Sequence, residues 1–190
     1  MMNRAIFIDR DGTLNEEVGY IVEASQFRLY DFAAEAVRLI NEANRRAIVI
    51  TNQSGVARGL FDEEFLLQLH KQMETSLTRE GARIDATYYC PHHPKYGESP
   101  YRRDCDCRKP KPGLIERAAK DFHLNLKESF VIGDRARDLE TGHAVGTRSV
   151  MVMTGYGREE WSTSPGSNRP QPEHVAENLL EAVRWILSVS

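Results

Sequence analysis

The sequence has few cysteines, no long apolar run and no excess of basic residues. Only three of its 190 residues are cysteine, and every hydrophobic run is far shorter than the roughly 18 residues that a membrane span requires. The segment MMNRAIFIDRDGT becomes charged at once, so we expect no secretory signal peptide. The formal net charge of -3 argues against a general nucleic-acid-binding protein. We therefore expect a cytoplasmic protein that binds neither membranes nor nucleic acids.

The length and the pattern of apolar residues predict one α/β domain. A chain of 190 residues is long enough for a sizeable core and too short for two ordinary domains, so we expect residues 1–190 to form a single domain. Short β-rich runs alternate with segments of helical periodicity, which is typical of a doubly wound, mostly parallel sheet covered on both faces. The predicted strands are 5–8, 47–51, 86–90, 129–134 and 149–153. The predicted helices cover about 33–43, 62–77, 113–122 and 178–187, and a flexible connection is expected over 162–172.

Polar residues suited to phosphate and metal chemistry lie at the ends of the predicted strands. Asp9 and Asp11 follow the first strand, Thr51 ends the second and Asp134 ends the fourth. Ligands of open parallel sheets bind beyond the carboxyl ends of the strands, so these residues are expected along one edge. Each has a simple structural explanation when taken alone: an acidic turn, an ordinary loop residue or a helix N-cap. Together with Lys109 they offer the oxygen ligands that Mg²⁺ prefers, and a hydroxyl and a cation for phosphoryl oxygens.

The order of these residues resembles the haloacid-dehalogenase (HAD) superfamily of aspartate-nucleophile phosphatases. The matching motifs are D-x-D-G-T at 9–13, Thr51, Lys109 and G-D-x-x-x-D at 133–138. The resemblance implies that Asp9 attacks phosphorus and becomes an aspartyl phosphate. It implies that Asp11 protonates the leaving alkoxide and then deprotonates the attacking water. Thr51 and Lys109 are expected to hold the transferring oxygens.

The same resemblance implies a magnesium site. Its ligands are expected to be Asp9, the backbone carbonyl of Asp11, and Asp134. Mg²⁺ offsets the repulsion between the nucleophile and the phosphate, and it stabilises charge in the transition state. Asp138 is expected to support this site through water or Arg135 and not to ligate the metal directly.

All three cysteines lie in one loop, and they predict a structural zinc site. Cys90-x-His92 and Cys105-x-Cys107 offer three thiolates and an imidazole, a set that fits tetrahedral zinc. From spacing alone His93 could replace His92, and three free cysteines are an alternative. The pattern C-x-H…C-x-C followed by RKPKPG resembles a HAD subgroup of sugar-bisphosphate and histidinol-phosphate phosphatases. In that subgroup the four residues named first would be the zinc ligands.

The position of this loop, about 90–109, suggests a purpose for the zinc. The loop is rich in proline, glycine and charge, and it leads directly into Arg108 and Lys109. A metal can make such a segment rigid where a hydrophobic core cannot. The loop would also stand in for the bulky cap domain of many relatives, because no long insert follows Asp11 or Thr51.

Two further segments, EEVGYI at 16–21 and NQSGVARG at 52–59, resemble the heptose-bisphosphate phosphatases of this subgroup. The resemblance implies hydrolysis of the 7-phosphate of D-glycero-D-manno-heptose 1,7-bisphosphate, on the route to nucleotide-activated heptose for surface glycans. Arg108 and Arg135 would recognise the sugar or its second phosphate. The other implied substrate contacts are Glu17, Val18, Gly19, Tyr20, Asn52, Gln53 and Ser54. A small enzyme without a cap is expected to be a monomer; the anomer is left open, and residues 155–190 match no functional pattern.

Three alternatives compete with this interpretation. Histidinol phosphate is the substrate of other members of the subgroup. A phosphoryl-accepting receiver domain is also doubly wound and also uses aspartate and Mg²⁺, but its acceptor would follow the third strand and it would lack a counterpart of Asp11. An inactive zinc-bearing interaction module would not need the full set of site residues, which is intact here: Asp9, Asp11, Thr51, Lys109 and Asp134.

Overall fold

A six-stranded parallel sheet forms the centre of the computed structural model, which describes residues 3–163 and 171–190. The strands are β1 (Ala5–Ile8), β2 (Arg46–Asn52), β3 (Ala86–Cys90), β4 (Phe130–Gly133), β5 (Arg148–Val152) and β6 (His174–Ala176). Their order is β3-β2-β1-β4-β5-β6, and all neighbours pair in parallel. The chain therefore builds outward from β1 on one side and then crosses to β4 on the other. This reversal places a topological switch point beyond the carboxyl ends of β1 and β4, where open sheets bind ligands.

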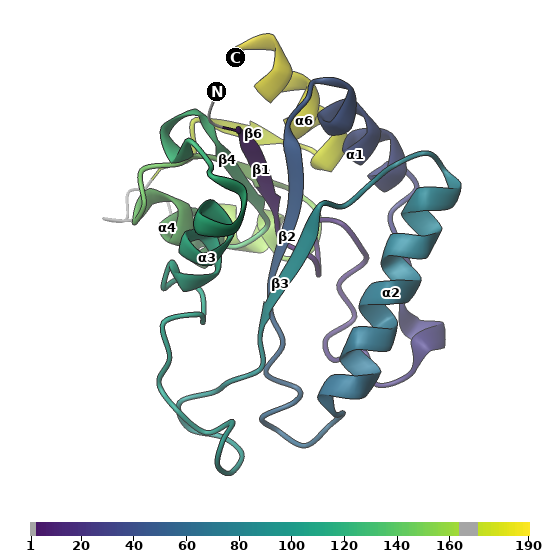
Figure 1. The fold of residues 1–190 in the computed structure, drawn as a ribbon, viewed down its shortest axis with the longest axis vertical. Coiled ribbons are helices and arrows are strands. Elements are labelled where there is room, and N and C mark those ends of the chain that lie inside the picture. The colour runs from purple at the N-terminus through teal and green to yellow at the C-terminus, as the bar shows by residue number, and fades with distance from the viewer. Residues whose placement is uncertain (1–2, 164–170) are drawn as a thin grey trace.

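Helices cover both faces of the sheet, as Figure 1 shows. One face carries α1 (Ala33–Glu42), α2 (Glu63–Arg79) and α6 (Leu179–Ser188), and the other carries α3 (Gly113–Phe122) and α4 (Ala136–His143). Alternate residues of β1 face opposite layers, with Ile6 and Ile8 in the larger core and Ala5 and Phe7 in the smaller one. The doubly wound fold predicted from the sequence is confirmed. Within the described ranges, no helix is both long and apolar enough to cross a bilayer.

The predicted elements all occur, with ends shifted by one or two residues. Asp62 was expected to begin a helix, and its carboxylate accepts a hydrogen bond from Phe65 N at 2.8 Å. The short helix α5 (Gly157–Ser162) and the edge strand β6 were not predicted. The flexible connection expected over 162–172 lies mostly outside the described residues. The fully described connections after β1 and β2 contain loops, a 3₁₀ turn and the helices α1 and α2, with no inserted cap domain.

Candidate active site

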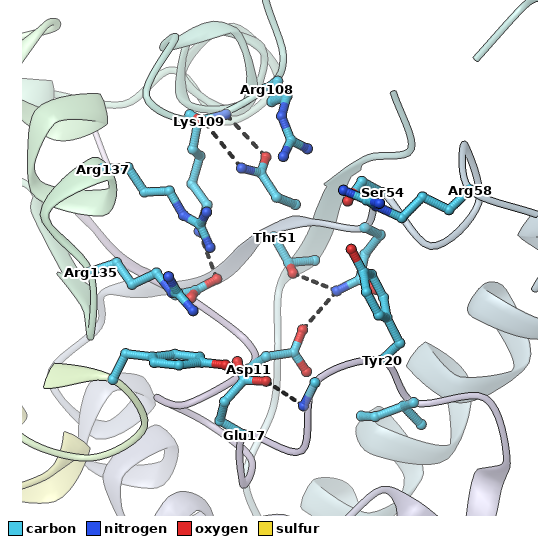
Figure 2. Close-up of a pocket in the computed structure, with 16 residues that line it drawn as sticks. Asp11, Glu17, Tyr20, Thr51, Ser54, Arg58, Arg108, Lys109, Arg135 and Arg137 are labelled. Carbon is cyan, nitrogen blue, oxygen red and sulfur yellow. Dashed lines mark hydrogen bonds and ion pairs between the residues drawn. The ribbon is translucent and has the colours of Figure 1, made fainter. Parts of the chain in front are cut away.

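A cavity of about 310 Å³ lies beyond the carboxyl ends of β1 and β2, and the segment after β4 completes its wall. Its lining comes from parts of residues 9–21, 51–58, 108–109 and 135–137, and from Tyr156. Figure 2 shows Asp11 and Thr51 toward the centre of this space, with arginines entering from several sides. The sheet topology thus brings together segments that lie far apart in the sequence, from Asp9 after β1 to Tyr156 after β5.

Lys109, which lines the cavity, joins two carboxylates. Its Nζ lies 2.6 Å from Asp9 Oδ1 and 2.7 Å from Asp138 Oδ1, and it also donates to the carbonyl oxygen of Ile50 at 3.0 Å. Burial alone would lower the pKa of Lys109, but the charges of Asp138 and Asp9 outweigh it and raise that pKa. Lys109 is therefore charged, and it holds the predicted nucleophile in a fixed orientation. The Arg135 backbone N–H donates to Asp138 Oδ2 at 3.1 Å at the start of α4, while support of a metal by Asp138 through Arg135 stays a prediction.

The same carboxylates form a group that fits a divalent cation. Oxygens of Asp9, Asp134 and Asp138 all lie within 4.8 Å of one another. Asp134 Oδ2 accepts a hydrogen bond from the backbone N–H of Tyr156, whereas Asp134 Oδ1 is buried without a partner. Burial raises the pKa of Asp134 to about 8, and the charges of Asp9 and Asp138 contribute. Crowded, buried carboxylates with a free oxygen are the hard donors that Mg²⁺ takes, so the residues fit the predicted ion.

Gly12 keeps room beside this group. Its φ of +86° is unfavourable for other residues, and a Cβ there would lie 2.3 Å from Asp134 Oδ2. The Thr154 hydroxyl donates to the Gly12 carbonyl oxygen at 2.6 Å, which ties the end of β5 to the turn after β1. Tyr156, which lines the cavity, also follows β5 and lies within residues 155–190, for which no functional pattern was expected.

The Asp11 carboxylate points away from the metal group and is surrounded by donors. Arg10 Nη2 lies 2.9 Å from both of its oxygens, while Gln53 donates at 2.8 Å and Asn15 at 3.1 Å. Burial would raise the pKa of Asp11, but Arg10 and the other donors outweigh it and lower that pKa. Asp11 is thus held as a carboxylate, the form in which it can accept a proton.

Arg10 is itself anchored by a buried histidine that the sequence analysis missed. The Arg10 side chain is only 2% exposed, and its Nη1 lies 3.1 Å from His70 Nε2 on α2. Burial, together with the charge of Arg10, lowers the pKa of His70 to about 3. His70 is therefore neutral, and Nε2 accepts the hydrogen bond. The chain His70–Arg10–Asp11 links the middle of a helix to the D-x-D segment, a contact that no local motif indicates.

The cysteine loop brings its four predicted ligands together. Cys105 Sγ lies 3.5 Å from Cys90 Sγ and 3.3 Å from Cys107 Sγ, and His92 Nδ1 lies 3.7 Å from Cys90 Sγ and 3.3 Å from Cys107 Sγ. These separations approach the roughly 3.8 Å edge of a tetrahedron with metal–sulfur bonds of about 2.3 Å. His93 lies outside the cluster, and its Nδ1 accepts from two backbone N–H groups. The donor set fits zinc, with His92 as the imidazole.

This cluster is connected directly to the cavity. Arg108 Nη1 donates to the carbonyl oxygen of His92 at 3.2 Å. The Asn52 amide clamps the Lys109 backbone, since Nδ2 donates to Lys109 O at 3.1 Å and Oδ1 accepts from Lys109 N at 3.0 Å. Asn52 was expected to contact substrate, and it lines the cavity while its amide is engaged in this way. Hydrogen bonding to Gln53 similarly orients the Thr51 hydroxyl.

Most of the predicted substrate contacts line the cavity. These are Glu17, Gly19, Tyr20, Asn52, Gln53, Ser54, Arg108 and Arg135. Val18 does not line it and is 48% exposed. Ile21, Arg58, Arg137 and Tyr156 also line it and were not predicted. Arg137 lies inside the G-D-x-x-x-D motif and Arg58 inside NQSGVARG, so a charge count over both motifs could have found them.

Comparison with known proteins identifies the family. A family model described as HAD-hydrolase-like matches residues 106–182. The D-glycero-beta-D-manno-heptose-1,7-bisphosphate 7-phosphatase of Pasteurella multocida is 43% identical over 186 residues, covering 97% of each chain. The chain belongs to this phosphatase family. The enzyme of the same name from Haemophilus ducreyi is 38% identical over 188 residues, covering 98% of this chain and 100% of the relative.

A solved structure supports the same assignment. It is D,D-heptose 1,7-bisphosphate phosphatase from B. bronchiseptica, complexed with magnesium and phosphate. It matches with a TM-score of 0.88 and 29% identity, covering 98% of this chain and 99% of the other. The HAD resemblance drawn from the sequence is confirmed, and the bound magnesium of that phosphatase agrees with the carboxylate group found here.

Replacing Cys107 by serine should reduce both zinc content and turnover. A hydroxyl is a poor zinc ligand compared with a thiolate, and Cys107 immediately precedes Arg108 and Lys109. A displacement of about 1 Å in a positioning group can cost on the order of 10²-fold in rate. The measurement is zinc per chain by atomic absorption beside kcat for a phosphate monoester. His93→Gln is the matched control and should keep its zinc; full zinc in Cys107→Ser, or a zinc-free variant with normal kcat, would contradict the prediction.

Replacing His70 by leucine should destabilise the fold. The buried Arg10 guanidinium would lose an acceptor, at a cost of about 1–3 kcal/mol. His70→Gln offers an oxygen in place of Nε2 and should retain more of the stability. Urea unfolding of the wild type and both variants measures the difference. If the leucine variant is as stable as the glutamine variant, the Arg10–His70 hydrogen bond contributes little.

Proposed function

We propose that this chain, as a single domain over residues 1–190, hydrolyses the 7-phosphate of D-glycero-D-manno-heptose 1,7-bisphosphate to give heptose 1-phosphate and phosphate. The observation that carries the proposal is the buried Asp9, held by Lys109 beside Asp134 and facing a cavity rich in arginine. Family membership supports this substrate, because the relatives are named for it. Those names specify the β anomer, and we propose the same anomer here.

Asp9 is the nucleophile of the proposed reaction. One of its oxygens attacks phosphorus, the bond from phosphorus to the sugar oxygen breaks, and Asp11 gives that oxygen a proton. Water then attacks the aspartyl phosphate while Asp11 takes its proton, and this step frees phosphate and Asp9. Bound Mg²⁺ would be held by Asp9, Asp134 and the Asp11 carbonyl, and it would neutralise charge on the nucleophile and the phosphoryl group.

The surroundings of Asp11 suit the second step directly. Its donors favour the carboxylate, which is the form that accepts a proton from water. The first step needs the protonated form. A phosphate dianion placed beside Asp11 raises the pKa of that carboxyl group, so substrate binding itself favours the acid. Thr51 holds the transferring oxygens, and Lys109 acts on them through its charge while its donors stay on Asp9, Asp138 and Ile50 O. Glu17, Tyr20 and the 52–54 turn contact the sugar.

The charge of the cavity separates this substrate from histidinol phosphate. Four arginines line the cavity: Arg58, Arg108, Arg135 and Arg137. A second phosphate would be attracted by these guanidinium groups, whereas the ammonium group of histidinol phosphate would be repelled. A receiver domain is disfavoured because its acceptor aspartate would follow the third strand, whereas Asp9 follows the first. A receiver would also lack a counterpart of Asp11, which can activate water here. We further propose that the enzyme acts as a cytoplasmic monomer without nucleic acid or membrane partners.

Asp9→Asn should abolish turnover while the fold is retained, because an amide cannot form the aspartyl phosphate. Asp11→Asn should slow turnover by roughly 10²-fold or more, the usual loss for a general acid and base. Phosphate release in the presence of Mg²⁺ measures both, and circular dichroism checks the fold. Substantial Mg²⁺-dependent activity in Asp9→Asn would mean that another residue is the nucleophile.

A substrate panel tests the proposed function itself. Phosphate release is compared for the α and β anomers of heptose 1,7-bisphosphate, heptose 7-phosphate and histidinol phosphate. The β bisphosphate should have the highest kcat/KM, because only a bisphosphate engages both ends of the cavity. A preference for histidinol phosphate would refute the proposal, and equal rates on both anomers would refute the anomer assignment.

A further inference from the structure

The segment G-D-R-A-R-D places two arginines on the wall of the cavity, and they differ in their partners. The guanidinium of Arg135 lies 3.5 Å from the centre of the Tyr156 ring, and its Nη1 lies 3.8 Å from Glu160 Oε1. The face of the Arg135 guanidinium therefore packs on Tyr156, and its charge is paired with Glu160. Arg135 is the arginine that family resemblance assigns to the substrate.

Arg137 has no comparable partner. It lies in the first turn of α4, lines the cavity and is half-buried. Its Nε is buried without a hydrogen-bond acceptor, and within the described ranges no carboxylate forms a salt bridge with it. An unsatisfied buried guanidinium N–H is costly unless a ligand supplies the acceptor. Figure 2 shows the Arg137 side chain reaching into the cavity from the same side as Arg135.

Arg137 also faces other cations. The charges of Arg137 and Arg108 repel each other across the cavity. Arg108 is fixed by its hydrogen bond to His92, so it cannot move away without disturbing the cysteine cluster. Lys109 is neutralised by two carboxylates. Arg108 and Arg137 form no salt bridge within the described ranges, although the charge of Glu17 also acts on Arg137, so both guanidinium groups can take a second anionic group.

We propose that Arg137, together with Arg108, binds the phosphate that is not transferred, and that Arg137 thereby determines the preference for a bisphosphate. This inference rests on the proposed function. A dianion between the two guanidinium groups would relieve their repulsion and would give the Arg137 guanidinium an anionic partner. Guanidinium groups suit this contact because their planar donors match two phosphate oxygens at once.

The experiment compares wild type with Arg137→Gln on heptose 1,7-bisphosphate and on heptose 7-phosphate, which lacks the second phosphate. For the bisphosphate, KM should rise about tenfold or more while kcat changes by less than about twofold, as expected for a charged hydrogen bond that acts in binding. For the monophosphate, kcat/KM should be unchanged. Arg137→Lys should restore only part of the preference, because an ammonium group is a single point charge.

Two controls keep the outcome interpretable. Arg158→Gln removes an arginine whose side chain is 71% exposed and does not line the cavity. This variant should leave KM and kcat unchanged for both substrates. Calorimetric titration of the bisphosphate into Asp9→Asn, with and without Arg137→Gln, measures binding apart from turnover and should show a loss of about tenfold or more.

Each result has one meaning. An equal loss on both substrates, or no loss on either, overturns the role of Arg137 while the proposed function stands. Wild-type enzyme that does not prefer the bisphosphate overturns the proposed function, and this inference with it. A selective rise in KM for the bisphosphate, matched by weaker binding, supports both.

Discussion

The buried ion pair between Lys109 and two aspartates is the interaction on which the site depends. Asp9 follows β1 directly, Asp138 lies on α4, and Lys109 lies at the far end of the cysteine loop. One ammonium group thus joins three parts of the chain at the switch point of the sheet. Removing one partner of such a buried pair leaves an uncompensated charge and typically costs about 3–5 kcal/mol. The nucleophile, the metal group and the loop are therefore positioned together or not at all.

This dependence explains the composition of the loop that carries Lys109. Residues 91–106 contain few apolar side chains, so burial cannot hold the loop in place. Its order comes from polar contacts and from four residues whose donor atoms converge as zinc ligands do. Arg108 is bonded to the backbone of one of them, and Asn52 clamps the backbone of Lys109. Metal binding and phosphate binding are in this way two functions of one continuous segment.

Local signals explain why the sheet and much of the site could be predicted. Short apolar runs, the N-cap at Asp62 and the motifs that follow strands are each encoded within a few residues. The contact between Arg10 and His70 could not be predicted in this way, because 60 positions separate the two residues and neither belongs to a ligand pattern. The edge strand β6 was missed because it has only three residues, of which only Ala176 is buried. Tyr156 follows β5, so the rule that ligands lie beyond strand ends could have identified it.

The cavity separates chemistry from recognition by how its cations are paired. Near Asp9, cations are neutralised: Lys109 by two carboxylates and Arg10 by Asp11. Farther out, Arg58 packs against the rings of Tyr96 and Tyr20, and the Arg108 side chain donates to a carbonyl oxygen and, among the described residues, forms no salt bridge. Such contacts fix the direction of a guanidinium group but leave its charge uncompensated. Under the proposed function, these outer guanidinium groups would bind the phosphate that is not transferred. A preference for a substrate with charge at both ends would then come from the wall of the cavity itself, since the described connections after β1 and β2 contain no cap domain.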